Sequence, residues 1–331
     1  MLDERKAHIL RAVVEEYIET AQPVGSAHVA RAASLQVSSA TVRNDMVVLE
    51  QEGYLTQPHT SAGRVPTDKG YRWFVDHLDE GMRSAPLDAA QVRTFFERAH
   101  GELEEMLSAT SRLLSDLTHY AAVVVGPPHS EATVRSVQLV GLAPRVALVV
   151  VVLSNGVIEK HTLEFDEDTD DAALTAATVR LSELLVGTVL SEAAQIEPLG
   201  PAARDAIVRL ALDVLGGVTE QDAGVFTSGA SGLASSFDAV AQVSEVLRVL
   251  EQQYVVVTLM RDVLDRGLSV AIGAETGLEP LAECSLVVAP YAADGEPIGT
   301  IGVLGPSRMH YQQALAAVAI VSRGLGDRLS E

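Results

Sequence analysis

The stretch SSATVRNDMVVLEQEGYL, residues 38–55, has the pattern of a short helix with a hydroxyl-rich start and a glycine stop. Ser38 or Ser39 can cap its N-terminus, and Gly53 suits the position just past its C-terminus. Apolar residues recur at i, i+4 and i+7, which predicts one buried face. The residues of that face are Val42, Met46 and Leu49.

The other residues at the start of this helix have side chains suited to DNA. Ser38, Ser39 and Thr41 can donate to phosphates alongside the free N–H groups of the first helical turn. Arg43 has the fork geometry that matches guanine, and Asn44 can pair with adenine through two hydrogen bonds. An ordinary capped helix in a protein-binding winged domain has the same pattern, so this helix alone leaves both interpretations open.

The neighbouring segments predict a winged helix-turn-helix in residues 1–80. Apolar residues at a helical period predict a first helix over 3–20, and a second, short helix follows over 26–33. Two short strands around a loop are expected within 54–65, and a last helix over 67–78. Three helices followed by a two-stranded hairpin have the element order of a winged helix.

The hairpin and the helix after it supply a basic wing. Its tip is expected to hold small or polar residues and its foot an arginine, and two further cations follow on the next helix. Such a wing can lie along a minor groove or its phosphates. The residues of this segment predicted to contact DNA are His59, Ser61, Gly63, Arg64, Lys69 and Arg72.

Charge is distributed unevenly along the chain. The 331 residues have a net charge of −21, of which residues 1–80 contribute −4, with 8 basic and 12 acidic side chains. Within 26–72 the balance is 5 basic to 4 acidic side chains. Any DNA-facing surface is therefore a small patch on an acidic body, which repels phosphate and suppresses non-specific binding.

The remaining residues predict one mostly antiparallel sheet that is interrupted by a mainly helical insertion. A polar linker at 79–86 leads into a long amphipathic helix over 88–120, and Asn155-Gly156 predicts a hairpin. Strands are expected at 121–125, 136–142, 145–153, 157–165, 269–272, 286–290 and 298–304. Helices are expected at 171–187, 201–215, 238–251, 258–266 and 309–329.

No motif for catalysis, a cofactor or a metal is present. The sequence contains no HExxH, CxxC or GxSxG. Gly299, Gly302 and Gly305 form GxxGxxG, which is not a dinucleotide fingerprint, and Cys284 at a strand start is interpreted as a core residue. No apolar run reaches the roughly 18 residues of a membrane helix, and the charged N-terminus lacks a signal core. A cytoplasmic location without membrane contact is expected.

Several motifs resemble those of the heat-inducible transcription repressor family, HrcA. The resemblance is close in SSATVRNDM and LEQEGYL, and most specific in QPHTSAGRVPTDKGYR, residues 57–72. SVAIGAE at 269–275, SLVVAPY at 285–291 and IGTIGVLGPSRMHY at 298–311 are also similar to segments of that family. The family often has Asp where His310 stands.

This resemblance implies an α+β multidomain chain with three parts. They are an N-terminal winged helix-turn-helix in 1–80, a GAF-like α/β sheet domain in 81–165 and 241–331, and a mainly helical inserted dimerisation domain in 166–240. Family members repress heat-shock (chaperone) operons by binding double-stranded DNA at an inverted-repeat operator, and a GroEL-type chaperonin maintains their activity. The implied partners are therefore operator DNA, the chaperonin and a second copy in a homodimer.

Two other functions compete with this one. The first is a small-molecule-responsive winged-helix repressor that uses a pocket in the GAF-like domain. The second is an enzyme with an appended DNA-binding domain, which the lack of a paired catalytic constellation disfavours.

The sequence also suggests how the chain assembles and folds. Leucines of the insertion are expected at the dimer interface, namely Leu181, Leu184, Leu185, Leu210, Leu212 and Leu215. Three apolar runs with strand character, 121–126, 146–153 and 254–260, favour aggregation when exposed during folding. Because the sheet is interrupted by an insertion, its contacts are non-local and folding should be slow.

Overall fold

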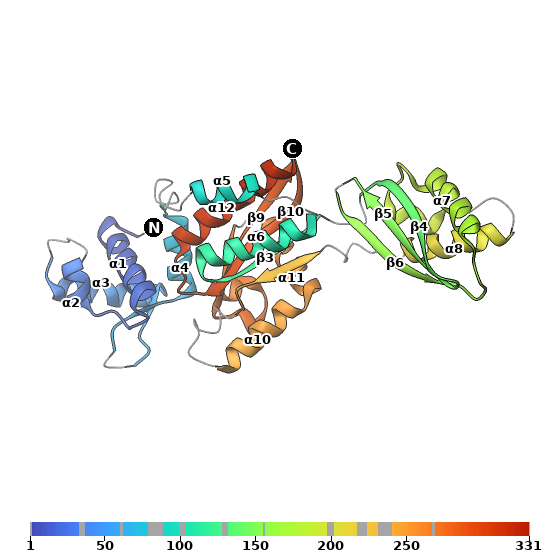
Figure 1. The fold of residues 1–331 in the computed structure, drawn as a ribbon. Coiled ribbons are helices and arrows are strands. Elements are labelled where there is room, and N and C mark those ends of the chain that lie inside the picture. Colours follow the sequence, from blue (N-terminus) through green and yellow to red (C-terminus); the bar gives the residue numbers. More distant parts are fainter. Residues whose placement is uncertain are drawn as a thin grey trace.

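The structure, a computed structural model, is elongated and consists of three bodies (Figure 1). It describes residues 2–32, 37–59, 62–78, 89–98, 103–127, 132–154, 156–196, 202–216, 224–230, 240–266 and 269–330. The first body lies at the N-terminal end, the second holds the C-terminus, and the third is connected to the second at its far end.

The first body contains the helices and the hairpin that the sequence predicts. Its elements are α1 (Glu4–Thr20), α2 (Ser26–Ala32), α3 (Ser39–Gln51), β1 (Leu55–Thr56), β2 (Val65–Pro66) and α4 (Asp68–Asp76). β1 and β2 pair antiparallel. The apolar stripe of α1 packs against that of α3, where Val42, Met46 and Leu49 are all buried, as expected.

The second body is an antiparallel five-stranded sheet between two helical layers. The strand order is β7-β3-β10-β9-β8. The strands are β3 (Ala121–Val125), β7 (Val225–Ser228), β8 (Val270–Ile272), β9 (Cys284–Ala293) and β10 (Glu296–Pro306). The helices are α5 (Ala89–Arg98), α6 (Leu103–Thr118), α10 (Val240–Glu251), α11 (Gln253–Asp265) and α12 (Tyr311–Leu329), with short 3-10 turns η3 (Gly273–Thr276) and η4 (Glu279–Leu281).

The burial of strand β3 shows that helices cover both faces of this sheet. All five of its residues are buried. Ala122 and Val124 pack in the core that includes α6 and α12, whereas Ala121, Val123 and Val125 pack in the core formed with α10 and α11. A fully apolar strand is expected where both faces of a sheet are covered by helices.

The third body has its own three-stranded antiparallel sheet, in the order β4-β5-β6. Its elements are β4 (Val134–Ala143), β5 (Val146–Leu153), β6 (Ile158–Glu164), α7 (Asp171–Leu185), η1 (Leu190–Gln195) and α8 (Ala202–Gly216). The buried residues of β5 alternate along the strand and pack in one core with Leu174, Leu181 and Leu185 of α7. The other face of β5 is only half-buried.

This topology corrects the predicted division of the chain. Strands expected in 136–165 were assigned to the same sheet as those of 269–304, but they form a separate sheet with α7 and α8. The interruption of the main sheet therefore begins after β3 and ends before β7, and does not start at residue 166. Hydrogen-bonding capacity along a strand does not reveal its partner, which explains the error.

Smaller predictions also need correction. The apolar run 254–260 lies in helix α11, not in a strand, and the Gly/Ser-rich region near 224–236 contains the strand β7. The helix expected over 88–120 is present as α5 and α6, with 99–102 outside the described residues. Four of the leucines expected at a dimer interface are buried inside the third body, namely Leu181, Leu185, Leu212 and Leu215.

Candidate nucleic-acid interface

The N-terminus of α3 is a capped helix start with its polar side chains exposed. Ser38 has an extended backbone, and its Oγ accepts from the N–H of Thr41 at 3.2 Å. The Ser38 and Thr41 hydroxyls also lie 3.0 Å apart. Ser38 and Ser39 are exposed. The cap leaves other N–H groups of the first turn available to an anion such as a DNA phosphate.

An ion pair and the core together set the direction in which α3 presents its outer face. Asp45 is buried and accepts from Nε of Arg5 at 2.8 Å and from Nη2 at 3.1 Å, which ties α3 to α1. With Asp45 and Met46 turned inward, Arg43 and Asn44 are exposed. In the described ranges no side chain of the protein pairs with Arg43. The helix start thus combines two side chains of the types that can read bases with donors suited to phosphate.

Val47 belongs to the same exposed surface, although the sequence analysis did not select it. Its side chain is 36% exposed, and it follows Arg43 by four residues and Asn44 by three. Residues at this spacing share one face of a helix. An exposed valine there can contact a thymine methyl group. The sequence does contain a feature that could have identified Val47: it is an apolar residue outside the buried stripe of Val42, Met46 and Leu49.

Arg64, predicted to contact DNA from the foot of the wing, braces the wing against α3. Its Nε and Nη2 both donate to Oε2 of Glu50, at 2.9 and 2.8 Å. The backbone of Arg64 bridges that of Val24. The positive charge of Arg64 is therefore balanced inside the protein, by Glu50 of α3.

Of the three remaining wing residues predicted to contact DNA, the structure describes two. His59 is exposed, and Ser61 lies outside the described residues. Gly63 is needed for a close approach, because a Cβ there would meet the carbonyl oxygen of Val24 at 2.3 Å. The hairpin is closed by Gln57, whose Nε2 donates to the carbonyl of Ala62 at 3.0 Å.

The two predicted cations of α4 also have partners in the protein. Lys69 Nζ donates to the carbonyl of Glu52 at 2.7 Å, just after the end of α3, and lies 4.4 Å from the ring centre of Tyr54. Arg72 contacts the second body, where it pairs with Glu275. The prediction that Arg64, Lys69 and Arg72 contact DNA remains untested, and their positions do not favour it.

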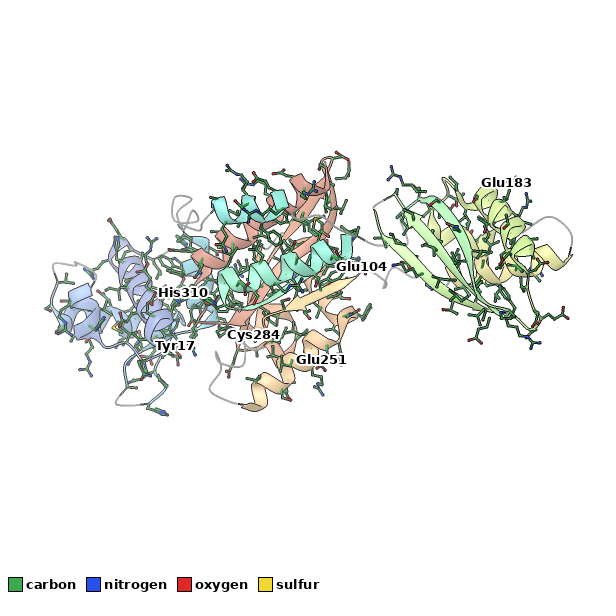
Figure 2. The ribbon with its side chains drawn as sticks, in the orientation of Figure 1. Tyr17, Glu104, Glu183, Glu251, Cys284 and His310 are labelled. Carbon is green, nitrogen blue, oxygen red and sulfur yellow. The ribbon has the colours of Figure 1, made fainter. Side chains whose placement is uncertain are left out.

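Other residues considered for chemistry are part of the core. Cys284 lies at the start of β9 in the second body (Figure 2), and burial raises the pKa of its thiol to about 12. A Cβ on Gly299, Gly302 or Gly305 would meet packed neighbours at less than 3 Å, so glycine at these positions allows close packing around the sheet. Across the described residues, no group of three or more His, Cys, Asp or Glu is arranged to hold a metal ion.

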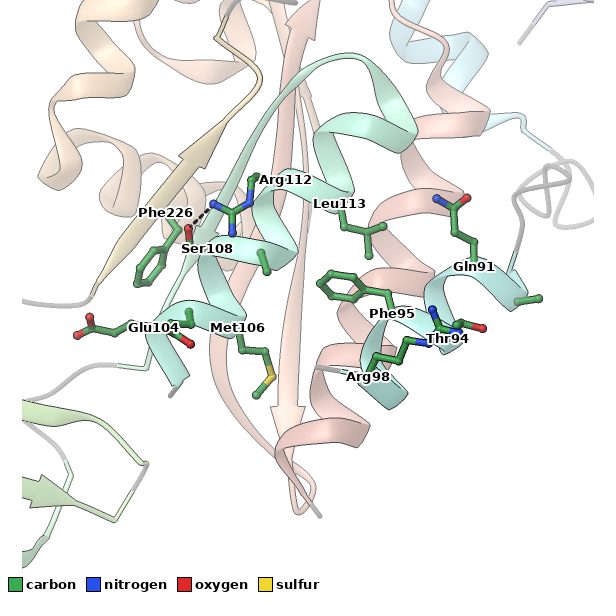
Figure 3. A pocket seen from close by; sticks show the side chains of 13 residues that line it. Gln91, Thr94, Phe95, Arg98, Glu104, Met106, Ser108, Arg112, Leu113 and Phe226 are labelled. Atoms are coloured by element: carbon green, nitrogen blue, oxygen red, sulfur yellow. Dashed lines mark hydrogen bonds between the residues drawn. The ribbon is translucent and has the colours of Figure 1, made fainter. Parts of the chain in front are cut away.

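A groove of about 1190 Å³ lies between α5 and α6 (Figure 3). Phe95, Met106, Leu113 and Phe226 form its apolar part. Its charged lining residues are Arg98, Glu104, Glu105 and Arg112, and all four are exposed. Small-molecule sites usually enclose a ligand between a few convergent polar groups. The described lining residues of this groove do not form such a group.

Comparison with known proteins gives concordant results. A family model described as HrcA protein C terminal domain matches residues 104–315. Proteins named heat-inducible transcription repressor HrcA match nearly the whole chain. One from Pseudarthrobacter chlorophenolicus is 40% identical and covers 98% of both chains. Another, from Moorella thermoacetica, is 35% identical over 100% of this chain and 98% of its own.

A solved structure shows the same fold. A crystal structure described as that of a hypothetical protein aligns with a TM-score of 0.73 and 22% identity, covering 100% of this chain and 99% of the other. Across the part of the chain that is described, no helix combines the length and apolar character needed to cross a membrane.

The fold and these relatives define the class of protein, which is a transcription repressor and not an enzyme. The chain belongs to the HrcA family of heat-inducible transcription repressors.

Proposed function

We propose that this repressor binds double-stranded DNA at an inverted-repeat operator upstream of chaperone operons, with the N-terminus of α3 in the major groove. The observation that supports this most is the exposed pair Arg43 and Asn44 beside the Ser38 cap. Arg43 reads guanine, Asn44 reads adenine, and Ser38, Ser39 and Thr41 hold the adjacent phosphate. Val47 adds an apolar contact on the same face.

The repressor acts as a homodimer, because an inverted repeat has two-fold symmetry that a symmetric dimer matches. The open face of the β4-β5-β6 sheet is the proposed interface. Its centre is the half-buried side of β5, formed by Val146, Leu148, Val150 and Val152. On the neighbouring strand, Val140 and Leu142 are 39% and 59% exposed. Exposed apolar surface of this kind marks interaction sites.

A GroEL-type chaperonin maintains the active fold of the repressor. The second body supports this, because β3 pairs with β7 about a hundred residues later and with β10 about 180 residues later. Such non-local pairings fold slowly, and they leave apolar strands exposed in the meantime. When heat fills the chaperonin with other clients, the repressor misfolds and its operons open. No sensor ligand is required.

Footprinting on the chaperone promoters of the source organism tests the DNA-binding proposal. Protection of a symmetric sequence by the full-length protein, and its loss in Arg43→Ala, is the expected result. Protection that is unchanged in Arg43→Ala and Asn44→Ala would exclude α3 as the reader. The groove between α5 and α6 does not favour a second, ligand-responsive function.

A further inference from the structure

Two of the family-like motifs, about 200 residues apart in the chain, meet at the junction between the first and second bodies. The end of QPHTSAGRVPTDKGYR supplies Asp68 and Arg72 on α4. The end of SVAIGAE supplies Gly273, Ala274 and Glu275, the first three residues of η3, directly after β8. None of these residues is needed by the proposed base-reading surface.

The centre of this contact is a forked ion pair. Arg72 donates through Nε to Oε1 of Glu275 at 2.9 Å and through Nη2 to Oε2. Arg72 Nη2 also donates to the carbonyl of Val270 at 2.6 Å. Glu275 is held in place by the backbone N–H of Ile272, 2.9 Å from Oε2. A fork of this kind constrains direction as well as distance.

Asp68 provides a second attachment next to the first. Its Oδ2 accepts from the backbone N–H of Ala274 at 3.2 Å. Gly273 has a φ of +52°, and a Cβ there would meet the Asp68 carboxylate at 2.2 Å. Only glycine fits this backbone and this approach. We call the set Asp68, Arg72, Gly273 and Glu275 the latch.

The rest of the junction combines a buried aromatic contact with a cleft. Tyr71 and Tyr311 meet with ring centres 6.0 Å apart. Beside them a cleft of about 390 Å³ separates α1 from the start of α12, and His310 lies 3.7 Å from Glu19 across it. Bodies joined by a small contact with a cleft are free to reorient unless specific contacts prevent it. The latch is the contact that defines one orientation.

We propose that the latch is a specificity device: it fixes the angle of α3 relative to the second body, and so narrows the range of half-site spacings that the repressor accepts. This inference rests on the proposed function, since it needs a dimer and an operator with two half-sites. In a symmetric dimer, the distance and angle between the two recognition helices depend on how each first body is attached. Arg72 and Glu275 are positioning residues that never touch DNA.

Glu275→Gln tests the proposal, because it preserves shape and removes the charge. Asp76→Asn is the matched control, since Asp76 contacts Arg72 within α4 at 3.4 Å without joining the two bodies. Each full-length protein is titrated with the natural operator, with an operator extended by half a helical turn, about 5 bp, and with a single half-site.

Wild type and Asp76→Asn should lose about 100-fold in affinity or more on the extended operator, because only one half-site remains in reach. Glu275→Gln should lose less than about tenfold, since a first body released from the latch can follow the displaced half-site. Its affinity for a single half-site should stay within about twofold of wild type, because α3 itself is intact. Equal spacing penalties in Glu275→Gln and wild type would overturn the proposal.

A measurement without DNA separates this proposal from the DNA-binding one. Spin labels on Gln51→Cys in α3 and Asp327→Cys in α12 report the angle between the bodies, since the native Cys284 is buried. Glu275→Gln should broaden the distance distribution, and Asp76→Asn should not. An unchanged distribution would refute the latch. A wild type that binds no operator would refute the proposed function instead, and the label distances would still decide whether the latch holds.

Discussion

Arg64→Ala distinguishes a DNA contact from a brace inside the protein. The sequence predicts that Arg64 contacts phosphate or the minor groove, whereas the structure pairs its guanidinium with Glu50 of α3. The brace interpretation expects a less stable first body and a normal salt dependence of DNA binding. The phosphate interpretation expects normal stability and a weaker salt dependence.

The expected destabilisation follows from the geometry. Two N–H groups of Arg64 donate to one oxygen of Glu50, at 2.8 and 2.9 Å. A hydrogen bond to a charged group contributes about 1.5–3 kcal/mol when buried. The Arg64 and Glu50 side chains are 15% and 32% exposed, so solvent screening reduces the effect. A loss of about 1–2 kcal/mol is expected.

Trp73 provides the assay. It is the only tryptophan of the chain, and it lies on α4, stacked on His77 at 4.4 Å between ring centres. Its fluorescence therefore reports unfolding of the first body. For a unit of 60–100 residues, 1 kcal/mol corresponds to about 4–8 °C in the midpoint. Glu50→Gln should lower the midpoint similarly, and the double variant should be less destabilised than the sum of the two.

The salt dependence of DNA binding tests the alternative interpretation, in which Arg64 contacts phosphate. Each phosphate contact that is lost lowers the slope of log Kobs against log salt by about 0.9. Arg64→Ala should leave this slope unchanged, and Arg64→Lys, which keeps the charge but not the fork, should resemble it in stability. A slope lowered by about 0.9 together with an unchanged unfolding midpoint would show that Arg64 contacts phosphate and would refute the brace.

Four further results are expected. Arg43→Ala should cost about 1–3 kcal/mol in operator binding and relax specificity at one base pair per half-site, and equal losses on random DNA would reduce Arg43 to a phosphate contact. Val140→Glu with Leu142→Glu should give monomers in sedimentation, whereas Val179→Glu, at a position of α7 that is 57% exposed, should remain a dimer. Operator binding after refolding from denaturant should recover only with chaperonin, and full recovery without it at heat-shock temperature would contradict the titration switch. Burial opposes ionisation of Glu275, but hydrogen bonds from Arg72 and from the Ile272 N–H outweigh burial and lower the pKa of Glu275. The difference in stability between wild type and Glu275→Gln should therefore persist above the usual glutamate pKa of 4.5. This difference should shrink as the pH falls below that value.

The elements of the first body follow from local patterns that the sequence displays directly. The stripe of Val42, Met46 and Leu49 and the Ser38 cap each depend on residues within two helical turns. Helix capping and helical periodicity are short-range effects, so the positions of α1, α3 and α4 and the exposure of Arg43 and Asn44 were predictable.

The strand partners and the partners of charged residues were decided only by the tertiary structure. Strands β4 to β6 have the same alternating pattern whether they join the main sheet or form their own, because every strand offers the same backbone donors and acceptors. Arg72 has the same chemistry for a phosphate as for a carboxylate. Its assignment depends on Glu275, a residue 203 positions away that the fold places against it. Long-range contacts of this kind leave no local pattern in the sequence. The latch is therefore defined only by the tertiary structure, which places α4 against η3.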